Sequence, residues 1–243
     1  DNNFLVEGLL ENKNLNLNDK IVSNFFKSYL SNLELKKINF NSKNKFSFKV
    51  NKKLKIDNLK IKSKIELDNL SLIDNFQLNK IFPNIENKIN LNNHLLIIDY
   101  DKNLLTINGD GNILLEDKDD KVEYSLKRKN KVLSFKTNAT IDKNTILIDL
   151  LNYKKKPDVK AKIKITGSYF MDKKTTTGSF SLTQNMNELY IQDLTLNHNL
   201  KVKKFKKISL NYLDEDLRQN KISITNKNNS YKLVGSKFNA NNL

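Results

Sequence analysis

The sequence of 243 residues contains no cysteine and no tryptophan, and it has only six glycines, two prolines, two arginines and three alanines. Without cysteine there is no disulfide framework, no cysteine-based zinc site and no iron–sulfur cluster. The scarcity of alanine and the presence of 40 asparagines argue against a helical bundle, because asparagine is a weak helix former. The longest uninterrupted apolar run, residues 95–98, is far shorter than a membrane-spanning helix.

The formal net charge is +16, and 41 of the 43 basic residues are lysines. Lys, Asn and Ile have A/T-rich codons, so genomic bias accounts for part of this excess. Specific nucleic-acid contacts favour the planar guanidinium of Arg, which is nearly absent, and the lysines are spread along the whole chain. We therefore expect a lysine-coated solvent face, with a weak affinity for polyanions, including anionic lipid headgroups.

Apolar and polar residues alternate with a period of two along most of the chain, which predicts strands that are apolar on one face. The alternation that includes Phe46 and Phe48 changes parity near Asp57 and Asn58, which predicts a bulge or a tight turn. Further alternating runs lie at residues 122–126, 159–165, 180–182, 194–196, 200–202, 208–212, 222–224 and 231–233. This pattern predicts at least a dozen antiparallel strands.

Asn, Asp and Lys form the breaks between these runs, at residues 108–111, 117–120, 127–130 and 226–229. Asn and Asp tolerate left-handed backbone angles, so they replace Gly in hairpin turns. Such short connections predict an up-and-down meander. Four of the six glycines, Gly8, Gly109, Gly167 and Gly235, come two residues after an aliphatic residue at an expected strand end, where we expect the sheet to bend.

Two segments depart from the strand period, at residues 18–33 and 74–89. The first spaces Ile21, Phe25 and Leu33 as on an amphipathic helix, and the second predicts a short helix broken at Pro83. We expect the first helix to pack on the sheet, because its polar face has too few cations for lipid headgroups.

The sequence offers no pattern typical of catalysis, and we expect no enzyme, metal or cofactor. His94 and His198 lack a nucleophile or metal-ligand companion at a recognisable spacing, and we interpret both as ordinary surface or turn residues. The acidic residues 117–120 lack the glycine and the distal glutamate of a calcium loop, so we interpret them as a hairpin tip.

The C-terminal stretch carries a resemblance to a known family. Residues 208–212 and 220–224, followed by 231–240 with Gly235 and Asn239, resemble the closing strands of AsmA-like, TamB- and YhdP-type bacterial envelope proteins, in particular the alphaproteobacterial AsmA-like domain. The looser likeness covers most of residues 46–243. It implies one AsmA-like β-rich region over residues 1–243, part of a longer chain. It also implies an elongated, curved antiparallel meander with an apolar concave groove and one or two short amphipathic α-helices.

The same resemblance implies a periplasmic location, with an inner-membrane anchor in a segment outside this chain. It further implies that the groove shelters phospholipid acyl chains for intermembrane lipid transport or outer-membrane integrity, with phospholipid or membrane, other segments of the longer chain and other envelope proteins as partners. The expected lipid-contacting residues lie on the apolar face: Ile163, Ile165, Leu194, Leu196, Leu200, Val202, Ile222 and Ile224.

The residue pattern alone fits a closed sandwich or barrel as well as an open groove, because a long apolar strip must be covered by a second layer, by helices or by ligand. One alternative is therefore a structural or adhesive surface β-protein with a closed, dry core. A weaker alternative is a lysine-rich binder of polyanions or nucleic acid.

Overall fold

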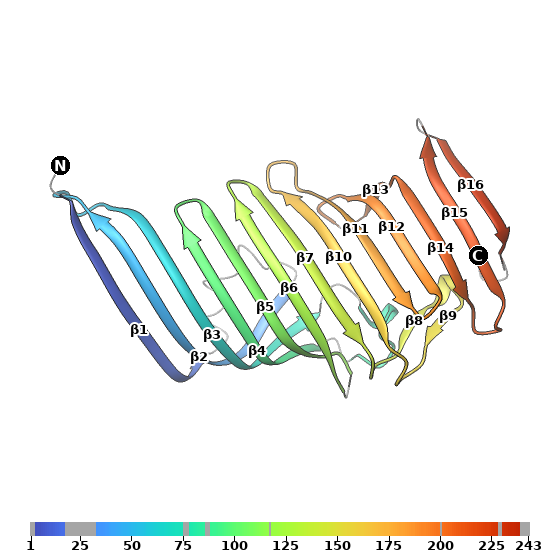
Figure 1. Cartoon of the computed structure of the whole chain (residues 1–243), viewed down its shortest axis with the longest axis horizontal. Coiled ribbons are helices and arrows are strands. Elements are labelled where there is room, and N and C mark those ends of the chain that lie inside the picture. The colour runs from blue at the N-terminus through green and yellow to red at the C-terminus, as the bar shows by residue number, and fades with distance from the viewer. Residues whose placement is uncertain are drawn as a thin grey trace.

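The protein is described by a computed structural model that covers residues 3–17, 33–74, 78–85, 88–116, 118–199, 201–227 and 230–238 (Figure 1). Fourteen strands form one antiparallel sheet, and two short strands form a separate hairpin. The strands are β1 (Phe4–Leu17), β2 (Leu33–Val50), β3 (Ile56–Asp74), β4 (Lys88–Asp101), β5 (Leu104–Leu114), β6 (Asp119–Lys129), β7 (Val132–Ile141), β8 (Ile146–Ile148), β9 (Tyr153–Lys155), β10 (Ala161–Phe170), β11 (Thr175–Gln184), β12 (Asn187–Leu196), β13 (Val202–Lys204), β14 (Lys207–Leu213), β15 (Gln219–Lys227) and β16 (Ser230–Lys237).

The order of strands in the sheet follows their order in the chain, from β1 at one edge to β16 at the other (Figure 1). The sheet is not closed. β8 and β9 pair only with each other, and β13 pairs with β12 off the main path. The predicted β-rich antiparallel meander is therefore confirmed.

Asparagine and aspartate supply the left-handed positions of this backbone. Twelve non-glycine residues have a positive φ, and eight of them are Asn or Asp, whereas none of the described glycines does. Asn58 is one of the twelve, and the pairing of β2 with β3 shifts register beside it. The parity change near Asn58 is thus a bulge, as predicted.

The four glycines expected at strand ends lie inside strands, so that expectation is wrong. Residues 108–111, predicted as a turn, lie within β5, where Gly109 is opposite Tyr124. A side chain at Gly109 would collide with the Tyr124 ring, and the rings of Phe46 and Phe135 occupy the same space at Gly8 and Gly167. At these positions the absence of a side chain leaves space for an aromatic ring on the neighbouring strand.

The structure describes only one of the two segments that were predicted to be helical. Residues 18–32 lie outside the described residues, and Leu33 begins β2. Between residues 74 and 89, the described part contains one 3-10 turn, η1 (Leu78–Lys80), in place of an amphipathic α-helix. Pro83 has no backbone N–H to donate and limits the turn, while Ile81 and Phe82 both donate to Leu78 O at 2.8 Å.

Two segments cover part of one face of the sheet: residues 78–85, and residues 146–155 with β8, a second 3-10 turn η2 (Asp149–Leu151), and β9. Leu147 N donates to Ile81 O at 2.8 Å and joins them. Their side chains and those of the sheet form the main core, whose buried members are Phe82, Ile85, Ile89, Leu115, Ile141, Ile146, Tyr153, Ala161, Leu182, Leu189 and Tyr212. In the described part of the chain, no helix has the length and apolar character needed to cross a membrane.

Candidate functional site

The register of the sheet places apolar side chains of successive strands side by side on one face, here called the apolar face. One cross-strand row contains Ile165, Phe180, Ile191, Ile208, Ile224 and Leu233, from β10 to β16. The neighbouring row contains Ile163, Leu182, Leu189, Leu210 and Ile222. Directly opposed side chains contact one another in such rows, so the face is apolar across the strands as well as along them.

A bulge in β12 keeps this face apolar where the sequence changes parity. Phe180 lies opposite Ile191, whereas Gly178 lies opposite Leu194, so β12 contains one residue more than β11 over this interval. Asp193 takes the left-handed conformation at the bulge, with φ of 51°. Leu194 therefore lies on the same face as Ile191, although the two residues differ in parity.

An apolar cavity of about 680 Å³ lies on the apolar face at the C-terminal end of the sheet. One side of it comes from η2 and the residue before it, through Ile148, Leu150 and Leu151. The other side comes from β11, β12 and β14–β16 and the residue that follows: Phe180, Leu189, Ile191, Ile208, Leu210, Ile222, Ile224, Leu233, Gly235, Ser236, Lys237 and Phe238. Almost all of these residues are apolar, so the cavity is suited to a hydrocarbon rather than a polar ligand.

Hydrogen bonds hold the η2 wall of the cavity against the sheet. Tyr212 Oη donates to Leu151 O at 3.0 Å, and Glu215 N donates to Asn152 O at 2.9 Å. Lys154 Nζ lies 3.5 Å from Glu215 Oε1. The wall is therefore fixed to β14 and to the turn that follows it.

Two buried tyrosines lie beneath this wall and pack edge to face, with 5.9 Å between their ring centroids. Burial raises the pKa of Tyr153 to about 12. Burial, assisted by the nearby Asp214 carboxylate, also raises the pKa of Tyr212. Both phenols are thus neutral at physiological pH and act as hydrogen-bond donors, Tyr153 to Gln184 and Tyr212 to Leu151.

A buried polar cluster anchors the start of the covering hairpin. The Asp120 carboxylate accepts hydrogen bonds from the backbone N–H groups of Asp142, Lys143 and Asn144 at 2.6, 2.9 and 3.2 Å. Lys155 Nζ donates to Asp142 O at 2.7 Å and to Asn144 O at 2.6 Å. Desolvation lowers the pKa of Lys155, while Asp120 and Asp142 oppose that shift. Asp120 was predicted to lie at a hairpin tip over residues 117–120. It lies instead within β6 and forms this anchor.

The predicted lipid-contacting residues divide into four groups. Ile222 and Ile224 line the cavity. Ile163, Ile165, Leu194 and Leu196 share the apolar face but lie outside the cavity lining, and Val202 is exposed on the off-path strand β13. Leu200 lies outside the described residues.

Sequence reasoning missed the cavity residues of the covering segment, Ile148, Leu150 and Leu151. They belong to a three-residue strand and a single 3-10 turn, which are too short to show a period. Ile208 and Leu210 of β14 carried a signal, because they alternate in the same way as Ile222 and Ile224.

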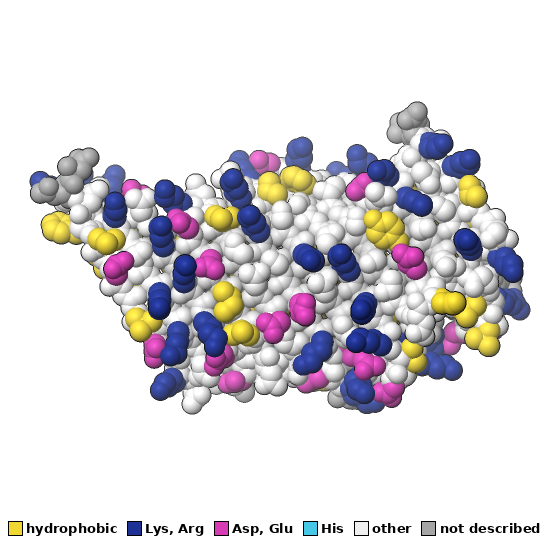
Figure 2. All heavy atoms as spheres, in the orientation of Figure 1, with side chains coloured by type: hydrophobic (Ala, Val, Ile, Leu, Met, Phe, Trp, Pro, Cys, Tyr) yellow, Lys and Arg dark blue, Asp and Glu magenta, His cyan; other side chains and the backbone are white. Residues whose placement is uncertain are grey.

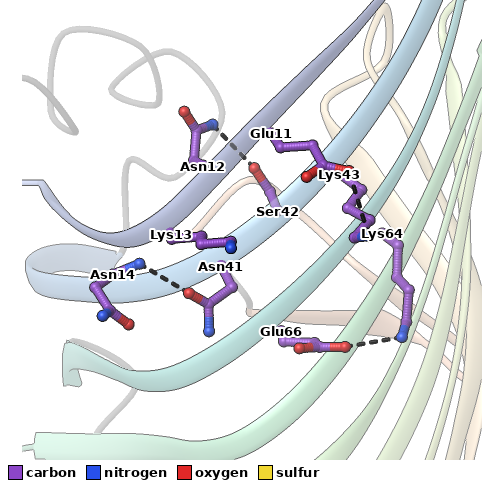
Figure 3. Close-up of a pocket in the computed structure, with 9 residues that line it drawn as sticks. All are labelled: Glu11, Asn12, Lys13, Asn14, Asn41, Ser42, Lys43, Lys64 and Glu66. Atoms are coloured by element: carbon purple, nitrogen blue, oxygen red, sulfur yellow. Dashed lines mark hydrogen bonds and ion pairs between the residues drawn. The ribbon is translucent and has the colours of Figure 1, made fainter.

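A second, polar cleft of about 320 Å³ lies at the other end of the sheet, around the bulge of β1 (Figure 3). Figure 3 shows that its side chains pair with one another: Asn12 Nδ2 donates to Ser42 Oγ at 3.0 Å, and Lys43 Nζ lies 3.3 Å from Glu11 Oε1. The cleft is therefore occupied by its own polar contacts, and we do not assign a ligand to it.

The two histidines lie in different environments. His198 is exposed, as expected, but the expectation of a surface His94 is wrong. His94 is 2% exposed, its Nδ1 lies 3.3 Å from Asn92 O, and its ring lies over Gly111 and 5.9 Å from the Tyr124 ring. Glycine at position 111 leaves the space that the imidazole fills. Among the residues that the structure describes, no group of His, Asp and Glu is arranged to hold a metal ion.

The opposite face of the sheet is polar. Figure 2 shows lysine side chains scattered over its strands, with acidic side chains and separate hydrophobic ones between them. Lys43, Lys60, Lys64 and Lys131 are examples that lie within 4 Å of an Asp or Glu oxygen. The positive charge is thus distributed over the face.

Comparison of the chain with protein-family models, with curated proteins and with solved structures found no match.

Proposed function

We propose that this protein is a non-enzymatic lipid-binding module that shelters an acyl chain in the apolar cavity between η2 and β14–β16. The cavity carries the proposal, because a space of about 680 Å³ lined mostly by apolar side chains is unfavourable when it holds water. Small-molecule sites range from about 300 to 1,000 Å³, so the space suits a segment of a hydrocarbon chain.

The cavity continues into the apolar rows of the sheet. Ile165 belongs to the same cross-strand row as Ile191 and Ile224, lies outside the cavity lining and is partly exposed. A long acyl chain therefore has an apolar path along the sheet face, and this supports the trough-like use of the face that the AsmA-like resemblance implies. Ser236 and Lys237, the polar members of the lining, offer a hydroxyl and a cation to a phospholipid headgroup.

We place this activity in the bacterial periplasm, in an AsmA-like envelope protein that moves phospholipid between membranes or maintains the outer membrane. The support is the sequence resemblance together with the observed antiparallel meander, which is the fold type that the resemblance implies. The closed, dry core of the alternative structural protein fits only the region under residues 78–85 and 146–155.

Titration with a fluorescent fatty acid tests the proposal. Leu150 lines the cavity but is 62% exposed, so Leu150→Glu places a charge at the cavity without removing a core side chain. We expect it to weaken binding at least tenfold. The matched control is Leu217→Glu, at a residue 78% exposed and outside the cavity lining, and we expect this variant to bind like the parent protein.

Circular dichroism and thermal unfolding of both variants establish that each is folded. Failure of the folded parent protein to bind fatty acid, or an equal loss in the two variants, contradicts the proposal. Mass spectrometry of the protein purified from a bacterial host then identifies which lipids accompany it, with phospholipid as the expected class.

A further inference from the structure

The edge strand β16 carries exposed apolar side chains on both of its faces. Tyr231 and Leu233 lie on the apolar face and Val234 lies on the polar face, and all three are more than half exposed. The outer edge of β16 is also where the apolar cavity ends, since Leu233 and Gly235 line it. An edge strand with this composition is suited to pairing with another strand.

The sequence of β16 is self-complementary when it pairs antiparallel with itself about a two-fold axis at Leu233. In this register Leu233 faces Leu233, Tyr231 faces Gly235 and Lys232 faces Val234. The regular part of β16 ends at Gly235, because Ser236 is the extra residue of a bulge against β15. No like charges are opposed, and the row from Ile208 through Ile224 to Leu233 continues into the same row of the second copy.

The Tyr231–Gly235 pairing repeats a contact that the sheet already uses. The rings of Phe46, Tyr124 and Phe135 occupy the space beside cross-strand glycines, whereas no ring lies near the position that a Gly235 side chain would take. Its nearest neighbour there is Lys221 O at 3.1 Å. In one copy the Tyr231 ring packs on Phe205, with 5.0 Å between the ring centroids. In the proposed register, Tyr231 of the second copy is the ring that lies opposite Gly235.

The neighbouring two-fold registers are worse. A centre at Lys232 opposes two lysines, and a centre at Val234 places Gly235 opposite Leu233 and leaves it without a ring. A centre at Gly235 needs a regular strand on both sides of Gly235, whereas β16 has a bulge at Ser236. Pairing must also oppose residues of equal parity, since each strand keeps its apolar face on one side.

We propose that two copies of this chain associate through β16, antiparallel and centred on Leu233, to form one continuous sheet. A two-fold axis is the commonest symmetry of homo-oligomers, and it brings the two apolar cavities together at Leu233. The association stands independently of the cavity's ligand, because it rests on the edge strand and its register.

Single cysteines test the register directly, because the chain contains no cysteine. Opposed residues of an antiparallel pair have Cα atoms about 4.5–5.5 Å apart, a separation that a disulfide spans. We expect Leu233→Cys to form a disulfide-linked dimer under mild oxidation. The control is Leu9→Cys, since Leu9 on the opposite edge strand β1 is 58% exposed against 62% for Leu233, and we expect it to remain largely monomeric.

A mixture of differently tagged Lys232→Cys and Val234→Cys copies gives a sharper test. We expect the mixture to form the mixed dimer, because these positions are opposed only across the proposed interface, and we expect each variant alone to cross-link at least fivefold less. Equal cross-linking of Leu233→Cys and Leu9→Cys, or of mixed and single samples, overturns the proposed register.

Val234→Lys tests the association without altering the cavity lining, because Val234 lies on the polar face and opposes Lys232 of the second copy. We expect analytical ultracentrifugation to show a dimer for the parent protein and for Leu9→Lys, and at least a tenfold weaker dimer for Val234→Lys. A parent protein that is monomeric at all concentrations overturns the proposal. Fatty-acid binding measured on the folded Val234→Lys monomer separates this outcome from failure of the lipid-binding function.

Discussion

The apolar face is packed differently over β3–β12 than over β14–β16, although the same alternation of residues produces both regions. Over the first region, residues 78–85 and 146–155 cover the sheet, and Ile141 of the sheet and Ile146 of the covering segment are almost completely buried. Over the second, Ile208 and Ile224 stay partly exposed and line a cavity. The difference arises from where the covering segments lie.

This contrast shows that strand patterning and site formation are separate properties of the sequence. Alternation makes a face that must be covered, and the covering segments decide which part becomes core. The part they leave open is available to a ligand, to a second copy of the chain, or to both.

The largest expected effect compares the same substitution in the two regions. Ile146→Ala removes a fully buried side chain and leaves a void, so we expect it to lower the free energy of unfolding by about 2–5 kcal/mol. Ile224→Ala enlarges a space that is already open, so we expect a loss of about 1 kcal/mol. Urea denaturation measures both, and equal losses would show that the cavity region is packed as tightly as the core.

Asp120→Ala tests how the covering hairpin is anchored. The substitution removes the acceptor of three backbone N–H groups and of Asn144 Nδ2, and we expect a loss of about 3 kcal/mol in the free energy of unfolding. Asp120→Asn keeps one acceptor oxygen and serves as the milder control. Hydrogen exchange should accelerate at residues 142–155 in the alanine variant before it does so in β14–β16. Uniform acceleration along the sheet would show that the anchor is not local.

Glycine substitutions compare how tightly the middle of the sheet and its edge strand β16 are packed. A side chain at Gly167 would lie 2.5 Å from Thr177 O and 2.7 Å from Phe135 Cζ, so we expect Gly167→Ala to destabilise the protein by about 1–3 kcal/mol. Gly235 has more space, and we expect Gly235→Ala to change the free energy of unfolding by about 0.5 kcal/mol or less. Thermal and urea unfolding of the two variants give the comparison, which fails if Gly235→Ala is the more damaging.

The smallest effect concerns pH and the buried His94. Burial lowers the pKa of His94 below 6.5, opposed by the Asn92 carbonyl and Asp110 and assisted by Lys121. The unfolded chain therefore binds a proton more readily, so stability is full above about pH 6.5 and falls as the pH drops towards the folded-state pKa. The free energy of unfolding, measured between pH 7.5 and 5.5, should fall with decreasing pH in the parent protein and in His198→Gln. His94→Phe should reduce this pH dependence. An unchanged pH dependence in His94→Phe would show that another group causes it.

Much of the fold could be predicted from the sequence, because period-two alternation reports directly on a sheet with one wet face. The bulge at Asn58 is a clear case, since the apolar residues change parity beside a residue that tolerates the left-handed conformation. The glycines were harder to interpret. Glycine is required at position 109 because the Tyr124 ring of the next strand occupies the space of a side chain. A contact between two strands leaves no pattern in the sequence around either residue.

The candidate site could be predicted only in part, for a related reason. Ile222 and Ile224, which were predicted on the apolar face, line the cavity, and their position in regular strands made that face readable from the sequence. Leu150 and Leu151 depend on a 3-10 turn held by the Tyr212 hydroxyl, 61 residues away along the chain for Leu151. Such a long-range hydrogen bond has no signature in a single sequence.

The sequential strand order has a consequence for how such a chain can change in length. Each strand of the main path pairs with the strands nearest to it in the chain, so a hairpin can be added or removed without rearranging the rest of the sheet. A pair of strands adds about 9–10 Å to the width of the sheet. The span of the protein is therefore a quantity that evolution can adjust in steps of one hairpin, independently of the covering segments that make its core.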